Sequence, residues 1–572
     1  MLLVFAAAPA CGPAEEGTTA EIAEAPPKRP NILWLVAEDL SPYLPAFGDS
    51  TVATPNLSRL AAEGVRYTNM YSPSGVCAPS RAAIATGLYP SSFGANHMRT
   101  GSYTEVTGLP KYQAVPPPEA RMVSEWMRLA GYYCTNNVKG DYQFDAPATA
   151  WDAWSNYAHW RNRATKGRPG PETPFYAVFN FGVTHESGLF EPYGPRYNEQ
   201  RHYQAGDTSF HTLPWGERSP DTTVVEHLPQ DADFSVPPYL PDNEVTRRDL
   251  WKMYNNIAEM DRQLGAVLDQ LEADGLLEET IIFFYGDHGG PLPRQKRLIY
   301  DSGLRVPLIV RFPNGARAGE IDDQLCSFVD FAPTLLHIAG QEVPDYMHGR
   351  SFVGDETPAR DYIHAAADRF DGFTDAIRAV RDARYKYIRN YRPEQGYYLP
   401  VTYREKIPTM RELLRLRDAG ELNEAQAQWF RETKPREELY DCQNDPHELR
   451  NLADDPAHAE KLAELSAEMD RWLADIGDRP NLPERELIAD LWDGADAMPT
   501  TANPRVETGE QLRITCDTEG ASIGYRVVPD DGPAPDAWQI YQKPVEVPAG
   551  TNLEVVAHRI GYQHSDTVRV GL

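Results

Sequence analysis

Four runs of apolar residues constrain the fold of this chain more than any other feature. They cover residues 31–36, 175–181, 280–285 and 306–312, and nearly every position in them is apolar. Runs of this length and pattern are typical of strands that are buried on both faces of a parallel sheet. Between them, residues 244–274 repeat apolar side chains at the spacing of an amphipathic helix. The alternation predicts an α/β fold, with a mostly parallel central sheet flanked by helices.

Beyond residue 360 the texture of the sequence changes, and 572 residues are too many for one ordinary domain. Residues 378–390 alternate like antiparallel strands, and residues 457–476 predict an amphipathic helix. From residue 506 onward, short β-rich pieces are divided by turns, which is typical of a small β-sandwich. The predicted parts are an export signal and tether at 1–30, the main α/β domain at 31–360, a smaller α+β subdomain at 361–480, a linker at 481–505 and a β-sandwich module at 506–572.

The amino-terminal segment is a short apolar run that ends in small residues and Cys11. It is too short to span a membrane and predicts an export signal with a lipoprotein-type cleavage site before Cys11. The segment leaves open whether Cys11 carries a lipid. The protein is therefore expected to be exported, and either periplasmic or anchored to the outer membrane as a lipoprotein. The remaining cysteines are scattered, and their spacing indicates neither a disulfide framework nor a structural zinc site.

Charged side chains follow several of the predicted strands at the point where each strand ends. Because the carboxyl ends of parallel strands meet at one edge of a sheet, we expect these side chains to lie close together, where α/β proteins bind ligands. Taken singly, each would be interpreted as an ordinary salt-bridge or helix-cap residue. Their joint position predicts a functional site. The residues are Glu38, Asp39, Lys139, His185, Asp287 and His288.

The predicted site has an acidic side and a basic side. Glu38, Asp39 and Asp287 would repel one another without a cation between them, and oxygen-rich sites favour Ca²⁺ or Mg²⁺. The net charge of −29 argues against nucleic-acid binding, and an anionic ligand would need a local group of cations. A metal and several cations around a nucleophile suit attack on a tetrahedral oxyanion ester. The expected cations are Arg81, Lys139, His185 and Lys296.

Residues 74–87 predict a helix whose first turn carries a cysteine. Cys77 occupies the expected N-cap position, Pro79 falls in the first turn and Gly87 ends the helix. Cys77 would face unpaired backbone N–H groups and the positive end of the helix dipole, a setting that suits an anion. Arg81 lies one turn further along. A buried structural thiol would fit the same position, so the helix alone does not decide between the two interpretations.

The sequence Cys77-Ala78-Pro79-Ser80-Arg81 matches the C-x-P-S-R signature of the sulfatases, and residues 86–90 (TGLYP) follow it as they do in that family. Over about residues 30–475 the chain resembles the formylglycine-dependent sulfatases of the alkaline phosphatase superfamily. The resemblance implies that a maturation enzyme oxidises Cys77 to formylglycine (3-oxoalanine), whose hydrate attacks sulfur. It also implies a Ca²⁺ ion that holds the sulfate. The implied metal ligands are Glu38, Asp39, Cys77, Asp287 and His288.

The resemblance also assigns roles to the basic residues. Lys139 matches the lysine of the family's K-x-H element, His185 the histidine after the middle strand, and Lys296 the second sulfate-binding lysine. Two positions depart from the pattern: Glu38 replaces the more usual aspartate, and Asp141 stands where the K-x-H element has its histidine. We therefore expect His185 to act as general acid toward the leaving group, and Asp141 to orient Lys139.

Finer features resemble the branch of heparan N-sulfatase (sulfamidase). They are residues 236–241 (VPPYLP), 438–441 (ELYD) and 445–452 (DPHELRNL), which indicate kinship more than substrate. The C-terminal module resembles the small β-domains appended to bacterial chitobiase-type glycosidases. The expected contacts to the substrate sugar are His97, Arg99, Asp141, Asp368 and Arg369.

Together these features predict a Ca²⁺-dependent sulfatase, a sulfuric ester hydrolase that acts on a sulfated polysaccharide or its oligosaccharides. Its expected partners are the sulfated carbohydrate and the formylglycine-generating enzyme. Two alternatives stay open: a phosphodiesterase or phosphonate hydrolase of the same superfamily, and an inactive protein that binds sulfated glycans. The sequence also leaves open the sugar and the choice between O-sulfate and N-sulfate.

Overall fold

The computed structural model describes residues 29–165, 168–190, 225–354, 358–509, 511–529, 537–548 and 550–572, together with Tyr193, Pro535 and the short strands β6 (Thr212–Leu213) and β7 (Gly216–Glu217). Cys11, with the predicted lipidation site, and nearly all of the predicted signal and tether lie outside these residues. Among the helices in the described part of the chain, none is both long enough and apolar enough to cross a membrane.

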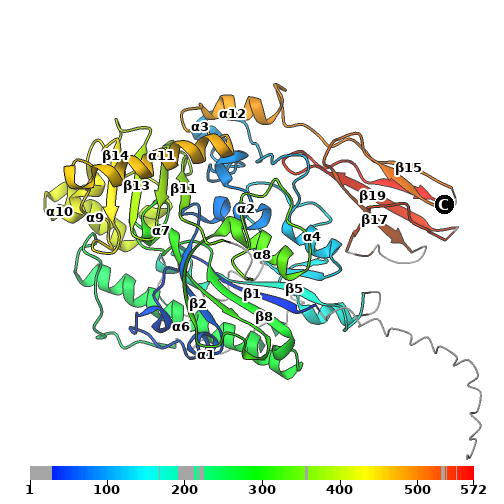
Figure 1. Cartoon of the computed structure of the whole chain (residues 1–572), viewed down its shortest axis with the longest axis horizontal. Coiled ribbons are helices and arrows are strands. Elements are labelled where there is room, and N and C mark those ends of the chain that lie inside the picture. Colours follow the sequence, from blue (N-terminus) through cyan, green and yellow to red (C-terminus); the bar gives the residue numbers. More distant parts are fainter. Residues whose placement is uncertain are drawn as a thin grey trace, which may run out of the picture.

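A mixed sheet of eight strands forms the centre of the molecule (Figure 1). Its order is β10-β2-β9-β8-β1-β5-β3-β4. From β8 to β4 neighbouring strands are parallel, whereas β9 runs antiparallel to both β8 and β2. The predicted mostly parallel sheet is confirmed. The strands are β1 (Asn31–Ala37), β2 (Val65–Tyr71), β3 (Tyr133–Asn137), β4 (Ala153–Trp154), β5 (Phe175–Phe181), β8 (Thr280–Gly286), β9 (Arg305–Arg311) and β10 (Ile321–Ser327).

Alternate residues of β1 enter two separate hydrophobic cores, which explains why this strand is apolar at successive positions. Leu33 and Leu35 pack on one face of the sheet, in the core that includes α1 (Pro55–Glu63) and α6 (Glu244–Ala273). Trp34 packs on the other face, in the core that includes α2 (Cys77–Thr86), α4 (Val123–Leu129) and α8 (Phe331–Ile338). These buried apolar surfaces, at roughly 25 cal/mol per Å², hold helices on both faces of the sheet.

A second, antiparallel sheet follows the main one, as the alternation in residues 378–390 predicted. It consists of β11 (Ile363–Ala367), β12 (Ile377–Arg381), β13 (Tyr385–Asn390) and β14 (Glu437–Asp441). The amphipathic helix α11 (Ala459–Ile476) packs on β12 and β13. The helix α9 (Pro408–Ala419), which lies between β13 and β14 in the sequence, contacts α6. This subdomain therefore packs against the helical layer of the main domain.

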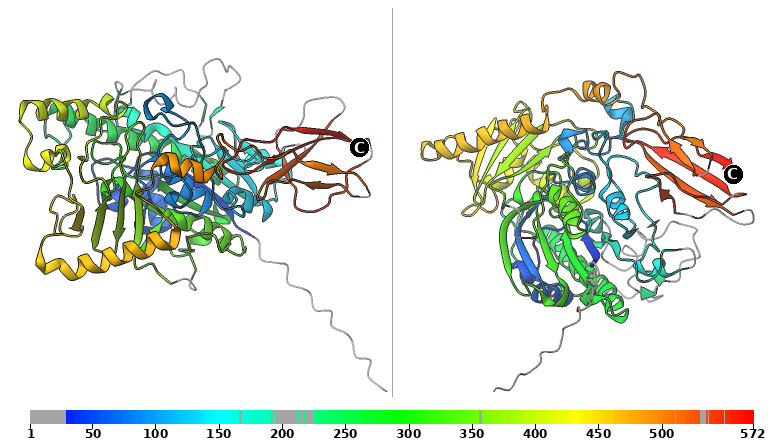
Figure 2. Two further views of the ribbon diagram at one scale, coloured as in Figure 1. Left: turned by 90° about the horizontal axis from the view of Figure 1, so that it is seen from above. Right: turned by 45° about the vertical axis from the view of Figure 1, so that its right-hand side comes forward.

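The C-terminal strands form a module that projects from one side of the main body (Figure 2). The helix α12 (Glu484–Leu491) leads to it. Its contact with the main domain includes a hydrogen bond from Arg121 to the Ser522 hydroxyl at 3.1 Å and one from Arg128 to the Trp538 carbonyl at 2.7 Å. A two-stranded and a four-stranded sheet contain β15 (Arg505–Glu507), β16 (Arg513–Thr515), β17 (Ser522–Val528), β18 (Gln539–Ile540), β19 (Asn552–His558) and β20 (Val568–Gly571).

The helix that carries the cysteine differs from its prediction in one detail. Val76 is the N-cap, with extended dihedral angles, and Cys77 is the first helical residue. The prediction therefore began the helix one residue too late, after Cys77 and not at it. Pro79 fits either of two neighbouring positions in the first turn of a helix, so it did not fix the start. Gly87 ends the helix in the left-handed conformation, with φ of 73°. As the first helical residue, Cys77 still faces the free N–H groups of α2.

Candidate active site

The carboxyl ends of β1, β3, β5 and β8 meet the first turn of α2 at one edge of the central sheet, and the loop after β8 closes over them. Apart from Lys139, whose side chain is 25% exposed, the residues predicted there are at most 6% exposed. The structure brings together Glu38, Asp39, Cys77, Arg81, Lys139, His185, Asp287, His288 and Lys296.

Cys77 lies at the centre of this group. Its Sγ is 3.3 Å from His288 Nε2 and 3.9 Å from Asp39 Oδ1. One turn along the helix, the Ser80 hydroxyl donates to the Asp287 carbonyl and joins α2 to the end of β8. The thiol therefore faces acidic and basic side chains as well as the positive end of the helix.

The loop that carries Lys296 packs directly against the start of α2. The backbone N–H of Arg297 donates to the Gly75 carbonyl at 2.7 Å. A Cβ atom at Gly75 would collide with the Leu298 carbonyl, so only glycine permits this approach. The close contact explains how Lys296, far away in sequence, reaches the site.

Asp39 shares its carboxylate among several donors. Lys296 Nζ lies 2.7 Å from Oδ2 and 2.9 Å from Oδ1, and the backbone N–H of Glu186 donates to Oδ2 at 2.7 Å. His288 Nε2 is 3.0 Å from Oδ1. Burial alone would raise the pKa of Asp39, but Lys296, His185 and His288 outweigh it and hold the pKa well below its ordinary value. Asp39 is therefore a carboxylate at neutral pH.

Asp287 holds the guanidinium of Arg81. Its Oδ2 accepts a hydrogen bond from Arg81 Nε at 3.0 Å, and its Oδ1 accepts one from the backbone N–H of Asp39 at 2.9 Å. Burial would lower the pKa of His288, but Asp287, Cys77 and Asp39 raise it to about 10. This raised pKa applies to His288 without a bound metal ion. The same negative charge would attract a metal cation, and a cation bound to Nε2 would replace the proton there.

The donor set fits a hard divalent cation. Asp39 and Asp287 are buried carboxylates beside the thiol, and their mutual repulsion would be relieved by a cation between them. The described groups whose ligand atoms all lie within 4.8 Å of one another include Asp39 with Cys77 and His185, and Cys77 with Asp287 and His288. A site for Ca²⁺ at the predicted place is compatible with these residues.

Glu38, a further predicted metal ligand, contacts the basic side of the site. Its Oε2 is 3.1 Å from Lys139 Nζ and 3.9 Å from His185 Nε2. Asp141 Oδ2 lies 3.9 Å from Lys139 Nζ, on the other side of that ammonium group. Burial would lower the pKa of Lys139, but Glu38, Cys77 and Asp141 raise it above its ordinary value, so Lys139 stays cationic. A glutamate reaches one methylene further than the aspartate that is usual here, and this reach suits the contact with Lys139.

The two ring nitrogens of His185 have different partners. The backbone N–H of Ser187 donates to Nδ1 at 3.2 Å, and the Ser187 hydroxyl lies 2.8 Å from the same nitrogen. Nε2 faces the site, 3.1 Å from Lys296 Nζ, which is a hydrogen-bond donor. The predicted general acid would therefore be the protonated ring, with Nε2 toward the leaving group.

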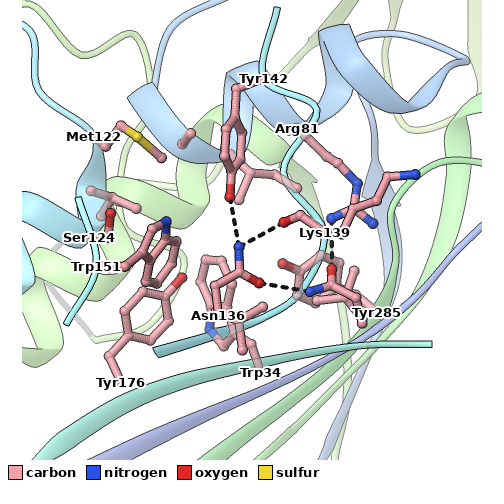
Figure 3. Close-up of a pocket in the computed structure, with 16 residues that line it drawn as sticks. Trp34, Arg81, Met122, Ser124, Asn136, Lys139, Tyr142, Trp151, Tyr176 and Tyr285 are labelled. Carbon is pink, nitrogen blue, oxygen red and sulfur yellow. Dashed lines mark hydrogen bonds between the residues drawn. The ribbon is translucent and has the colours of Figure 1, made fainter. Parts of the chain in front are cut away.

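The sequence analysis missed two asparagines that join the basic residues. Arg81 Nη1 donates to Asn180 Oδ1 at 2.8 Å, and Asn180 Nδ2 donates to Asn136 Oδ1 at 3.0 Å. Asn136 in turn donates to the Lys139 carbonyl at 2.7 Å and to the Tyr142 hydroxyl at 3.1 Å (Figure 3). This chain runs beside a small cavity of about 30 Å³. Asn180 carried a detectable signal, because it is an amide inside the otherwise apolar run at residues 175–181.

A buried ion pair beside the site was also missed. Glu186 accepts two hydrogen bonds from Arg297, at 2.8 and 2.9 Å, and lies 3.3 Å from Lys296 Nζ. Burial would raise the pKa of Glu186, but Arg297 and Lys296 lower it to about 2. The pair thus positions the Lys296 loop. Its signal was weak, because both residues are only the sequence neighbours of predicted ones.

Most of the residues predicted to contact the sugar gather at two turns that lie side by side. Asp368 pairs with Arg378 at 2.9 Å, and Arg369 pairs with Glu484 of α12 at 2.7 Å. His97 Nδ1 accepts the backbone N–H of Arg369 at 3.3 Å. Arg99, by contrast, has a side chain that is 44% exposed and lies 3.8 Å from Asp371. Of the five predicted contacts, Asp141 thus lies apart beside Lys139, while His97, Asp368 and Arg369 are buried against internal partners and Arg99 is the most exposed.

Comparison with known proteins identifies the same segments. Residues 30–341 match the family model described as Sulfatase, and residues 292–411 match the model described as N-sulphoglucosamine sulphohydrolase, C-terminal. The chain is 60% identical over 551 residues to an ulvan-active sulfatase of Formosa agariphila, which covers 95% of this chain and 91% of that protein. The resemblance to sulfatases, and to the N-sulfatase branch, is therefore confirmed.

Solved structures show the same fold at low sequence identity. A protein in complex with its substrate D-glucosamine-2-N,6-O-disulfate covers 79% of this chain and 99% of its own, with a TM-score of 0.52 and 18% identity. A phosphonate monoester hydrolase from Silicibacter pomeroyi covers 79% of this chain and 96% of its own, with a TM-score of 0.51 and 19% identity. The fold alone is thus common to more than one hydrolytic chemistry.

Proposed function

Because this chain belongs to the sulfatase family of sulfuric ester hydrolases, we propose that it hydrolyses the sulfate esters of a sulfated polysaccharide through an oxidised Cys77. One observation carries the proposal. The Cys77 thiol is buried at the first turn of α2, 3.3 Å from His288, where carboxylates and cations converge. Formylglycine at this position supplies, as its hydrate, an oxygen nucleophile for sulfur.

The basic residues of the site would stabilise the charge that grows on the sulfate oxygens during attack. Arg81, Lys139 and Lys296 are all held by carboxylates and kept as cations. His185 would give its Nε2 proton to the departing sugar oxygen as the sulfur–oxygen bond breaks, or to nitrogen if the substrate is an N-sulfate. Asn180 and Asn136 would hold the Arg81 side chain and the Lys139 loop in fixed positions relative to each other.

Asp39, Asp287 and His288 would hold the Ca²⁺ ion, with Glu38 reaching it if the contact with Lys139 opens. The ion supplies positive charge against the sulfate oxygens. The chain's part is to hold these carboxylates in place: Lys296 keeps Asp39 ionised, and Arg81 forms an ion pair with Asp287. Lys296, Arg81 and the metal ion would thus all interact with the carboxylates of Asp39 and Asp287.

The substrate is proposed from the relative of known activity. That protein is an ulvan-active sulfatase and is 60% identical to this chain over nearly its whole length. We therefore expect ulvan, or oligosaccharides cut from it, to be the sulfated carbohydrate. The formylglycine-generating enzyme would act earlier, before Cys77 becomes buried at 1% exposure.

The decisive experiment compares sulfate and phosphate esters. The protein is produced together with the maturation enzyme, and sulfate release from ulvan oligosaccharides and from 4-nitrophenyl sulfate is measured beside turnover of bis(4-nitrophenyl) phosphate. We expect faster turnover of the sulfates and loss of activity after chelation of Ca²⁺. Preference for the phosphodiester would favour the phosphonate hydrolase alternative, whose fold is shared. A peptide mass that shows unmodified Cys77 in the native host would favour the inactive glycan binder.

The predicted cellular location follows the same proposal. A polysaccharide is degraded outside the cytoplasm, and the apolar run before Cys11 fits an exported enzyme. Membrane fractionation of the native host, with a Cys11→Ala variant as control, distinguishes a periplasmic protein from a lipid-anchored one.

A further inference from the structure

Buried cations in this chain are paired almost everywhere. In the described ranges, each buried lysine and arginine other than Arg404 contacts a carboxylate or donates to at least two backbone carbonyls. This is expected, because a buried charge is costly unless it is paired and hydrogen-bonded. Arg404 is therefore an exception that needs an explanation.

The surroundings of Arg404 hold its guanidinium in place without neutralising it. Arg404 begins the short turn η9 (Arg404–Lys406) and is 3% exposed. One Nη donates to the Leu399 carbonyl, whereas its Nε has no acceptor among the described residues. The guanidinium lies over the rings of Trp429 and Tyr398, at 4.7 and 5.5 Å. The rings attract a cation but offer it no strong hydrogen-bond acceptor.

Arg404 follows Tyr403, a residue that borders the proposed general acid His185. The ring of its neighbour Tyr403 is 6.4 Å from the ring of His185. Burial and the positive charge of Arg297 lower the pKa of Arg404 to about 10, so it stays cationic at neutral pH. Arg297 is tied through Glu186 to the loop of Lys296. The two guanidinium groups therefore stand close enough to repel each other, with Glu186 as the carboxylate that Arg297 already uses.

Arg297 also retains an unused donor toward this region. Its two Nη groups bind Glu186, but its Nε has no acceptor among the described residues. An anion between the two arginines would accept hydrogen bonds from both and would relieve their repulsion. Their low exposure does not exclude such a ligand, because Lys296 and Arg81 in the sulfate site are equally buried.

We propose that Arg404 and Arg297 together bind a second anionic group of the substrate, a carboxylate or a further sulfate ester. This inference rests on the proposed function and narrows the substrate class. His185 gives its proton to the departing sugar, so a group bound beside His185 belongs to that sugar or to its neighbour in the chain. The enzyme would thus prefer saccharides that carry two anionic groups over those that carry the scissile sulfate alone.

Matched substrates test the inference. Sulfated oligosaccharides with a uronate carboxylate are compared with the same oligosaccharides after carboxyl reduction, and disulfated with monosulfated ones, so that the two sources of the anion are separated. We expect kcat/KM of the wild-type enzyme to be about 10- to 100-fold higher for one of the doubly anionic substrates. In Arg404→Met this ratio should fall close to one, and Arg404→Lys should restore part of it.

The ratio is measured with one preparation of each variant, so a partly unfolded sample does not change it. Arg163→Met is the matched control, because Arg163 is also buried, lies over the Phe175 ring at 5.0 Å and is at the opposite end of β5. Its ratio should equal that of the wild type. Equal cleavage of singly and doubly anionic substrates, or a ratio that survives in Arg404→Met, would overturn the second anion site and leave the sulfatase intact. No sulfate release from any substrate would overturn both.

Discussion

Two buried clusters of charged side chains make the most instructive comparison in this molecule. The strand-end cluster surrounds Cys77 and contains Glu38, Asp39, Arg81, Lys139, His185, Asp287, His288 and Lys296. The linker cluster contains His97, Asp368, Arg369, Arg378, Asp478 and Glu484. Both are buried and both consist of the same residue types, so burial and charge alone do not distinguish a site from a structural network.

The difference lies in what the ion pairs surround, because pairs in both clusters are equally short. In the linker cluster Arg369 pairs with Glu484 at 2.7 Å and Arg378 with Asp368 at 2.9 Å, and in the strand-end cluster Lys296 pairs with Asp39 at 2.7 Å. The first linker pair joins the turn after β11 to α12, the helix that leads to the C-terminal module, and the second joins that turn to β12. In the strand-end cluster the partners converge on a thiol at a helix start. The first arrangement stabilises an interface, whereas the second can bind and attack an anion.

Replacement of Cys77 by alanine should have the largest effect, a loss of activity in the strand-end cluster with little loss of stability. Cys77→Ala removes the group that we propose as precursor of the nucleophile, so sulfate release should fall by at least about 10⁴-fold. The melting temperature should change little, because one buried sulfur atom is lost. Steady-state sulfate release and thermal unfolding are measured together, with the buried Cys326→Ala as matched control. Activity that survives in Cys77→Ala would disprove the role of this residue.

Replacement of Arg369 should affect stability instead of catalysis. Arg369→Met leaves the Glu484 carboxylate buried without its partner, which should lower the free energy of unfolding by about 3–5 kcal/mol. Denaturant unfolding measures the loss, and kcat per folded molecule should stay near the wild-type value. The double variant Arg369→Met with Glu484→Leu should recover most of the stability. A large fall in kcat would instead assign Arg369 to substrate binding, as the sequence predicted.

Acid should lower the stability of the folded protein by protonating Glu186, which pairs with Arg297 beside the strand-end cluster. Its pKa is about 2 in the folded protein and 4.5 for an ordinary glutamate, so its stabilising contribution is complete above pH 4.5 and is lost as the pH falls toward 2. The contribution amounts to about 3 kcal/mol. Glu186→Gln should therefore be less stable than the wild type at pH 7, and the difference should shrink below pH 4.5 and vanish only near pH 2. Melting temperatures across this range are the measurement, and a constant difference would contradict the assignment.

The smallest expected effect concerns Asn180, which supports Arg81 from behind. Asn180→Ala removes the acceptor for Arg81 Nη1 at 2.8 Å and should lower kcat/KM for sulfate release by about 10-fold. Asn390→Ala, a buried asparagine of β13 that bonds Glu438 at 2.6 Å, is the matched control and should keep full kcat/KM. Equal rates in the two variants would show that Arg81 needs no support.

The sequence by itself determined the sheet and the residues of the strand-end cluster. Apolar runs report burial on both faces directly, because side chains alternate between the faces of a strand. Charged residues at strand ends must then meet, because parallel strands share one edge, and the C-x-P-S-R signature at Cys77 indicated the sulfatase family. These inferences need only local pattern and the geometry of a parallel sheet.

Only the tertiary structure decided which charges are used up and which stay available. Arg369 and Asp368 seemed free to bind sugar in the sequence, but Glu484 and Arg378 neutralise them in the fold. Arg404 carried no sequence signal, yet it is buried, donates to one backbone carbonyl and has no direct ion pair among the described residues. The partner of a charge is set by tertiary packing: Arg369 meets a carboxylate more than 100 residues away, and Asp368 meets Arg378 of the neighbouring strand. No local sequence pattern encodes either contact.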